Sequence, residues 1–152
     1  MTTIGIDQSY TCTAMYIQDG KNNPMITIPS SKDDDIYDRA NHIASTVVHY
    51  AKEYKPEVIR IEGLAFGGKG NSTRDLAGLQ MLIVVELRKA GYNPIIVPPT
   101  TLKKASTTSG KATKEQMHDA LPQAIKDRLV GYKKTTGLYD LVDAYWLAVY
   151  NG

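Results

Sequence analysis

Residues 3–28 read TIGIDQSYTCTAMYIQDGKNNPMITI, and their alternation of short apolar runs with turn residues is typical of a sheet built from consecutive strands. The apolar and β-branched runs predict strands over Thr3–Asp7, Thr11–Ile17 and Met25–Ile28. From Ile36 to Tyr54 the apolar residues instead recur every three to four positions, which predicts an amphipathic helix that ends before Pro56. The chain therefore begins with three strands and a helix.

Beyond Pro56 the patterns alternate between strand and helix. Two more strands are predicted, over Glu57–Glu62 and Pro94–Val97, and three more helices, over Arg74–Ala90, Thr113–Leu121 and Leu138–Tyr150. Thr100–Gly110 is polar and basic, and no helix or strand is predicted there. This order predicts an α/β fold with a mixed five-stranded sheet flanked by helices and right-handed crossovers. No linker divides the chain, so residues 1–152 are expected to form a single domain.

The composition excludes several classes of protein. The 152 residues are 42% hydrophobic and 22% charged, as in an ordinary globular domain. The net charge of +2 excludes a histone-like polycation and a disordered acidic tail. The single cysteine, Cys12, excludes an intramolecular disulfide and a cysteine-based zinc site, and we expect it to be a core residue. Without an apolar run of membrane-spanning length or a signal peptide, we expect a soluble cytoplasmic protein with no membrane partner.

Two carboxylates stand at the ends of predicted buried strands. Asp7 ends the run Ile4–Asp7, and Glu62 ends the run Val58–Glu62 with a glycine-rich loop after it. A buried carboxylate is costly unless it is paired or bound to a metal. Taken singly, Asp7 could accept hydrogen bonds in a turn and Glu62 could be solvated at a sheet edge. Together they indicate neighbouring strands that deliver two carboxylates to the edge where α/β sites usually lie.

Asp140 and Asp143 share one face of the last predicted helix, because they are three positions apart. The rest of this helix is almost entirely apolar, and we expect its tyrosines and tryptophan to be core residues. Favourable interaction with the helix dipole is an alternative that explains Asp140 better than Asp143. A divalent cation explains all four acids, since carboxylate oxygens suit Mg²⁺ or Mn²⁺, and two such ions would clamp the attacking and leaving oxygens of a phosphodiester displacement.

The order of these acids resembles that of the ribonuclease H-like nucleases, and within them the RuvC-type Holliday junction resolvases. The resemblance covers nearly the whole chain and implies a ribonuclease H-like fold, with Asp7, Glu62, Asp140 and Asp143 as catalytic metal ligands. The stretch Thr101-Leu102-Lys103-Lys104 through Gly110 to Lys114 is similar to the family segment in which two lysines precede a helix, which implies that Lys103 and Lys114 face DNA and the active site. The short length and the loop after Glu62 look more like the phage-encoded branch.

The region around these lysines is strongly basic. Residues 98–114 hold four lysines and no acid, interleaved with hydroxyl residues, a composition suited to binding phosphate groups. A solvated loop would look similar. We predict that DNA is bound by Lys69, Lys103, Lys104, Lys111 and Phe66. In bacterial resolvases an aromatic residue three positions after the strand-end Glu wedges the junction, whereas Phe66 is four positions after Glu62.

Other motifs favour no competing function. Residues 63–69 fit G-x-x-x-x-G-K, but Gly70 follows where a nucleotide-binding loop has Ser or Thr. Asp33–Asp35 directly precede a predicted helix, so capping explains them better than a metal does. His42 and His49 lie seven positions apart and His118 stands alone, so a zinc hydrolase is not indicated.

We therefore predict a crossover junction endodeoxyribonuclease that depends on Mg²⁺ or Mn²⁺, with two ions per active site. Its expected partners are branched DNA, chiefly four-way junctions, and a second copy of the chain, since the resemblance implies a homodimer. The predicted interface is the helix Arg74–Ala90. The alternatives are a ribonuclease H that acts on RNA–DNA hybrids and a non-catalytic DNA-binding module on the same fold. If the chain is phage-encoded, it would act in the host cytoplasm.

Overall fold

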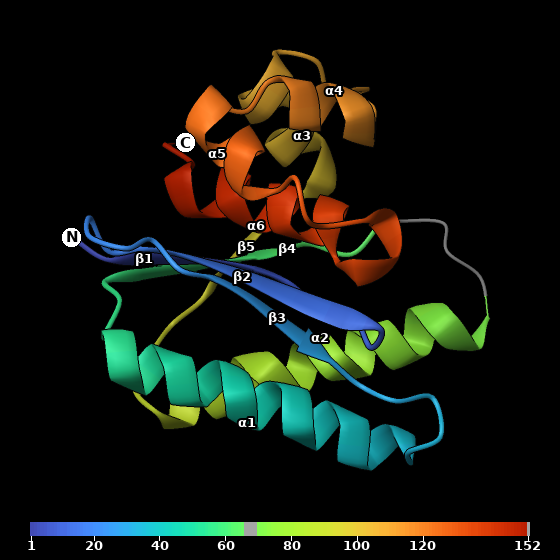
Figure 1. The fold of residues 1–152 in the computed structure, drawn as a ribbon. Helices are drawn as coiled ribbons and strands as arrows, with labels where there is room; N and C mark the ends of the chain where they lie inside the picture. Colours follow the sequence, from blue (N-terminus) through green and yellow to red (C-terminus); the bar gives the residue numbers. More distant parts are fainter. Residues whose placement is uncertain (66–69, 152) are drawn as a thin grey trace.

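The computed structural model describes residues 1–65 and 70–151. Its sheet has the order β3-β2-β1-β4-β5, built from β1 (Thr3–Asp7), β2 (Cys12–Gln18), β3 (Met25–Pro29), β4 (Val58–Glu62) and β5 (Ile95–Val97). The first three strands pair antiparallel, whereas β4 is parallel to both β1 and β5 (Figure 1). The predicted mixed five-stranded sheet is confirmed.

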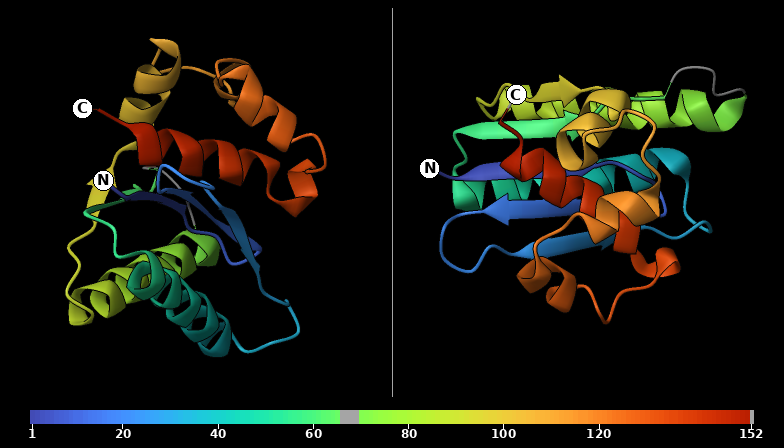
Figure 2. Two further views of the ribbon diagram at one scale, coloured as in Figure 1. Left: turned by 60° about the vertical axis from the view of Figure 1, so that its left-hand side comes forward. Right: turned by 90° about the horizontal axis from the view of Figure 1, so that it is seen from above.

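Helices cover both faces of this sheet. The helices α1 (Ile36–Tyr54) and α2 (Asn71–Lys89) lie on one face, and α6 (Leu138–Val149) lies on the other. The second layer also holds α3 (Pro99–Thr107), α4 (Lys114–Asp119) and α5 (Gln123–Arg128), as the turned views of Figure 2 show. Each layer has its own hydrophobic core, and the α/β class predicted from the sequence is therefore correct. None of the helices in the described ranges is both long and apolar enough to span a membrane.

Gly5 lets α6 pack directly on the central strand. A Cβ atom at this position would overlap the carbonyl oxygen of Ala144 and the backbone nitrogen of Ala148. The backbones of β1 and α6 approach each other so closely here that only glycine can be accommodated. The glycine therefore sets the depth at which α6 lies on β1, and with it the position of the acidic residues that α6 carries.

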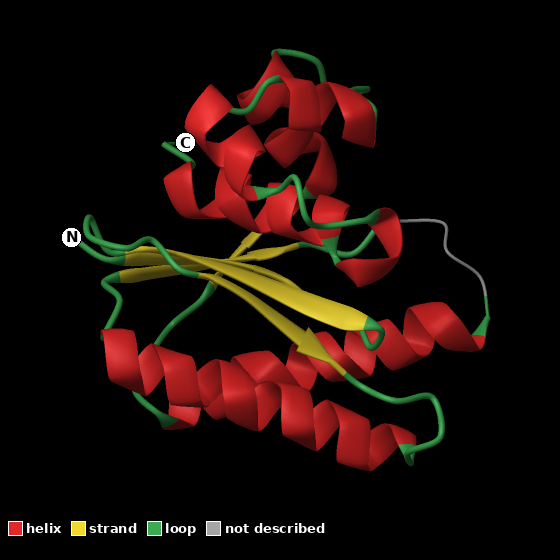
Figure 3. Ribbon diagram, in the orientation of Figure 1, coloured by secondary structure: helices red, strands yellow, loops and turns green. Residues whose placement is uncertain are grey.

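Three short helical segments were not predicted from the sequence, and they are visible in Figure 3. They are α3, α5 and the 3-10 helix η1 (Lys134–Thr136), and α3 falls in the segment left without an assignment. Among their residues only Leu102 of α3 is buried. Because a helix with at most one buried residue shows no apolar stripe, hydrophobic periodicity could not reveal these elements.

Candidate active site

The parallel pairing of β1 and β4 brings two acids to one edge of the sheet. Ile6 pairs with Ile61, so Asp7 and Glu62 are the next residues on adjacent strands that run in the same direction. The helix α6 adds Asp143 from the layer above. One carboxylate oxygen from each of Asp7, Glu62 and Asp143 lies within 4.8 Å of the others. The structure thus brings together three of the four predicted metal ligands.

Burial and mutual repulsion make this cluster electrostatically unusual. Burial, followed by repulsion from Glu62, Asp143 and Asp140, raises the pKa of Asp7 well above 3.8. The pKa of Asp143 rises to about 8, mainly through burial and then through the charge of Glu62. Burial also raises the pKa of Glu62 and of Asp140. Without a cation, the cluster therefore retains protons near neutral pH.

The acids line a cavity of about 300 Å³ that also contains two of the predicted lysines. Lys103 reaches it from α3 and Lys114 from the first turn of α4. The positive charge of Lys114 opposes the effect of burial on the pKa of Glu62, Asp140 and Asp143. Asp140 lines the same cavity but lies outside the set of three whose oxygens are within 4.8 Å of one another. All the polar groups needed for a phosphate-processing site therefore share one cavity.

Lys114 is held at the cavity by the local structure of α4. Thr113 caps this helix, accepting a hydrogen bond from the backbone N–H of Gln116 at 3.1 Å, and its own N–H donates to the Gln116 side chain at 2.9 Å. Met117 is buried and anchors the helix in the core. This capping box fixes the first turn, where Lys114 lies.

The donor chemistry of the cluster fits a divalent metal ion. One buried and two half-buried carboxylates offer hard, negatively charged oxygens, which Mg²⁺ and Mn²⁺ prefer. Their repulsion and burial raise every pKa in the cluster, a cost that a cation would remove. Asp7, Glu62 and Asp143, with Asp140 beside them, are the residues that could hold it.

The other predicted DNA-binding residues fall into two groups. Lys104 on α3 and Lys111 before α4 are exposed and do not line the cavity. Phe66 and Lys69 lie outside the described residues, as does the end of the G-x-x-x-x-G-K match. The DNA-binding role of all four stays a prediction.

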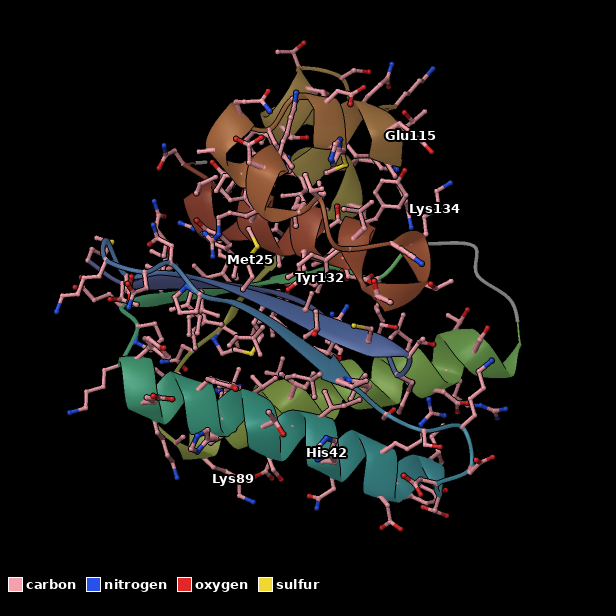
Figure 4. The ribbon with its side chains drawn as sticks, in the orientation of Figure 1. Met25, His42, Lys89, Glu115, Tyr132 and Lys134 are labelled. Carbon is pink, nitrogen blue, oxygen red and sulfur yellow. The ribbon has the colours of Figure 1, made fainter. Side chains whose placement is uncertain are left out.

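The structure agrees with the simpler interpretations of the remaining polar motifs. Asp35 caps α1 and accepts a hydrogen bond from the backbone N–H of Tyr37 at 2.8 Å. In the described part of the chain, the one group of three potential metal ligands contains no histidine, and His42 lies on α1, across the sheet from α6 (Figure 4). Cys12 is buried as expected, and Tyr145 and Trp146 pack in the core.

The sequence did not single out three polar residues near the site, namely Gln8, Gln80 and Lys134. Gln8 is buried, lines the cavity and lies next to Asp7, and Gln80 of α2 is hydrogen bonded to it. Lys134 of η1 lies 5.6 Å from the ring centre of Tyr139, and Lys114 lies 6.0 Å from the same ring. The ammonium of Lys134 is also 3.9 Å from a carboxylate oxygen of Glu115, on the side of the molecule shown in Figure 4. A single glutamine or lysine has no periodic signal, so only tertiary contacts reveal these residues.

Comparison with known proteins gives a consistent family match. The family model described as crossover junction endodeoxyribonuclease RuvC matches residues 4–150 of the chain. A curated relative, the crossover junction endodeoxyribonuclease RuvC of Corynebacterium diphtheriae, is 26% identical over 152 residues, which cover 96% of this chain and 90% of the relative.

Solved structures have the same fold. The structure of Thermus thermophilus RuvC superimposes with a TM-score of 0.77 at 18% identity, covering 97% of this chain and 91% of that one. The T. thermophilus RuvC in complex with a Holliday junction substrate gives a TM-score of 0.78 at 20% identity, covering 97% and 90%. At these identities the likeness establishes the architecture, in agreement with the fold predicted from the sequence.

Proposed function

The chain belongs to the RuvC family of crossover junction endodeoxyribonucleases, and we propose that it is a metal-dependent endonuclease that cuts four-way (Holliday) DNA junctions by phosphodiester hydrolysis. The observation that carries this proposal is the cluster of buried Asp7 with half-buried Glu62 and Asp143, whose oxygens lie within 4.8 Å of one another in a cavity that also holds Lys103 and Lys114. Acidic residues that bind a cation, beside lysines that attract phosphate, form the machinery of a nuclease.

We assign Asp7, Glu62, Asp140 and Asp143 to the binding of Mg²⁺ or Mn²⁺, with two ions per site as the working number. Asp7 is central among them, since the charges of the other three acids all raise its pKa. Such ions supply charge stabilisation and positioning for the displacement at phosphorus. Because the acids must lose their protons to serve as ligands, metal binding is expected to release protons near neutral pH.

The lysines act on the phosphate rather than on the metal. Lys114 is close enough to influence three of the acids electrostatically, so its ammonium is placed to stabilise negative charge on a phosphate that enters the cavity. Lys103, at the same cavity, holds the neighbouring DNA backbone in position. Lys104 and Lys111, both exposed, extend the basic surface along the duplex, and Phe66 and Lys69 remain predicted DNA-binding residues.

A homodimer would supply the second active site needed to cut two opposed strands. On α2, Leu79 and Ile83 are fully buried in the core, whereas Met81 is 66% exposed and Val85 is 41% exposed. Of the apolar residues on this helix, the buried ones serve the core, so the proposed dimer interface is centred on the exposed side chains of Met81 and Val85. We expect Met81→Glu to shift the mass in solution from dimer to monomer, while Lys52→Glu on α1 should leave it unchanged. A wild-type monomer at micromolar concentration would contradict this assignment.

One preparation tested on several substrates distinguishes the proposed function from its rivals. With Mg²⁺, we expect cleavage of four-way junctions in preference to flaps and RNA–DNA hybrids, and cleavage by Asp143→Asn that is lower by about a thousandfold or more. Preferential cleavage of the RNA strand in hybrids would instead identify a ribonuclease H. Junction binding without any cleavage would identify a non-catalytic DNA-binding module. We place the activity in the cytoplasm, or in the host cytoplasm if the chain is phage-encoded.

A further inference from the structure

The peptide group that follows Glu62 is hydrogen bonded on both sides. On one side, the N–H of Gly63 donates to the carbonyl oxygen of Val97 on β5 at 2.7 Å. On the other side, the carbonyl oxygen of Glu62 accepts from the side-chain amides of Gln8 and Gln80, each at 3.0 Å. The paired residues of β1 and β4 end at Ile6 and Ile61, so these two amides continue the hydrogen bonding where the strand ladder stops.

The two amides are also joined to each other. The amide nitrogen of Gln80 donates to the side-chain oxygen of Gln8 at 3.3 Å, besides its bond to Glu62. Gln8 is only 5% exposed and directly follows Asp7, whereas Gln80 comes from α2 on the opposite face of the sheet from α6. The pair therefore connects the end of β1, the end of β4 and α2.

The hydrogen bonds of Gln8 and Gln80 to Glu62 oppose the repulsion among the acids of the cluster. One carboxylate oxygen from each of Asp7, Glu62 and Asp143 lies within 4.8 Å of the others, so their negative charges repel one another at short range. Because Asp7 ends β1 and Glu62 ends β4, this repulsion acts to separate the ends of the two strands. The pairing between β1 and β4 stops at Ile6 and Ile61, and the N–H of Gly63 bonds to β5 rather than to β1. Hydrogen bonds from Gln8 and Gln80 to one carbonyl resist that separation.

We propose that Gln8 and Gln80 form an amide clamp that positions the carboxylate of Glu62 against Asp7 and so preorganises the metal site. This inference rests on the proposed function, in that the acids it positions are those assigned to metal binding. Both glutamines are positioning residues, because their bonds are to the backbone of Glu62 and to each other. Groups that orient metal ligands affect metal affinity or activity about 10–100-fold when removed.

The test replaces each amide by a side chain of similar size that cannot donate. Gln8→Met, Gln80→Met and the double variant are compared with Gln18→Met, which removes an amide at the opposite end of the sheet, where Gln18 pairs with Thr3. Mn²⁺ binding to the DNA-free protein is measured by electron paramagnetic resonance, alongside thermal unfolding in EDTA and junction cleavage over a range of Mg²⁺ concentrations.

We expect Mn²⁺ affinity to fall about 10-fold in each single variant and about 100-fold in the double variant, with no change in Gln18→Met. Cleavage should recover in part at high Mg²⁺, a response that a merely structural defect would not show. If either Met variant fails to fold, Gln80→Ala on the half-exposed side of α2 makes the same test, since alanine favours the helix and admits water.

Unchanged Mn²⁺ affinity in the folded double variant would overturn the clamp, whatever its cleavage rate. An equal decrease of affinity in Gln18→Met would overturn it too, because the effect would then be general. Failure of the proposed function has a different signature: wild-type protein that binds Mn²⁺ but cuts no branched DNA. In that case the difference in Mn²⁺ affinity between wild type and the clamp variants still decides the inference.

Discussion

Arg60 and Glu62 lie two positions apart on β4, and the fold treats their charges in opposite ways. The guanidinium of Arg60 donates to the carbonyl oxygens of Leu147 at 3.0 Å and Ala148 at 3.3 Å, and it lies 5.6 Å from the ring centre of Tyr150. The carboxylate of Glu62 instead meets other carboxylates. The positive charge of Arg60 has carbonyl and ring partners on and just after α6, whereas the negative charge of Glu62 lies among like charges with Lys114 as an opposing charge.

The same helix is responsible for both environments. The last turn of α6 presents backbone carbonyls to Arg60, whereas Asp143 earlier in the helix adds a further acid to Glu62 and Asp7. A helix C-terminus is a natural partner for a cation, so the end near Arg60 is a structural solution. Like charges buried together destabilise a fold unless a ligand compensates them. The contrast supports the proposal that the acidic end, where like charges lie together, is the functional one.

Removing one acid tests this contrast most strongly. Asp143→Asn should lower junction cleavage about a thousandfold or more, because several kcal/mol of charge stabilisation depend on the metal. The unfolding temperature in EDTA should stay the same or rise, since a like-charge interaction is relieved. Asp7→Asn should behave in the same way. Normal cleavage by both variants would place the active site elsewhere, and unfolding of both would make the acids structural.

The second largest effect is expected in the pH dependence of stability, which should reflect the acids around Glu62 and not Arg60. The pKa of Asp143 in the folded protein, about 8, exceeds the ordinary value of 3.8 expected in the unfolded chain. Between these two pH values Asp143 keeps its proton in the folded protein but loses it in the unfolded chain. The free energy of unfolding therefore decreases as pH rises from about 4 to about 8. Each such proton can change the unfolding free energy by as much as about 1.4 kcal/mol per pH unit.

Denaturant unfolding in EDTA, compared between wild type and Asp143→Asn, isolates this effect. We expect the variant's stability advantage to grow from pH 5 to pH 8 and to shrink when Mg²⁺ is added, since a cation stabilises the ionised acids. An advantage that is constant with pH, or that falls as pH rises, would contradict the assigned shift.

Arg60→Met tests the partnered end. Removing the two charged hydrogen bonds to α6 should lower the unfolding free energy by about 1–2 kcal/mol, a reduced figure because Arg60 is only partly buried. Mn²⁺ affinity and the cleavage rate of the folded protein should not change. If Arg60→Met instead impaired metal binding with stability intact, the proposed division between the two ends would fail.

The smallest effect is expected from the lysines. Lys103→Ala and Lys104→Ala should weaken binding to junctions of any sequence and reduce the slope of log affinity against log salt by about one for each phosphate that is no longer neutralised. Lys52→Ala on α1 is the matched control, since it changes the charge equally on the opposite face of the sheet. An unchanged slope in both test variants would show that this basic segment does not bind DNA.

Much of the fold followed from local patterns. The strands from Thr3 to Ile28 and the helices with apolar stripes formed close to their predicted bounds, although α2 begins at Asn71 rather than Arg74. The helices α3, α5 and η1 were missed because they bury almost no side chains. The phage branch suggested by the short chain stays a prediction, as the family match does not address it.

By itself, the sequence determined which residues could carry the chemistry. An acid at the end of an apolar strand or within an apolar helix can be recognised from the local sequence, without knowledge of the tertiary fold. Tertiary structure alone decided which charges found partners. The bonds of Arg60 to α6 span 87 and 88 positions, and the bond between Gln8 and Gln80 spans 72. No local periodicity encodes such pairs, since they arise only when Gly5 admits α6 onto β1 and the parallel strands align their ends.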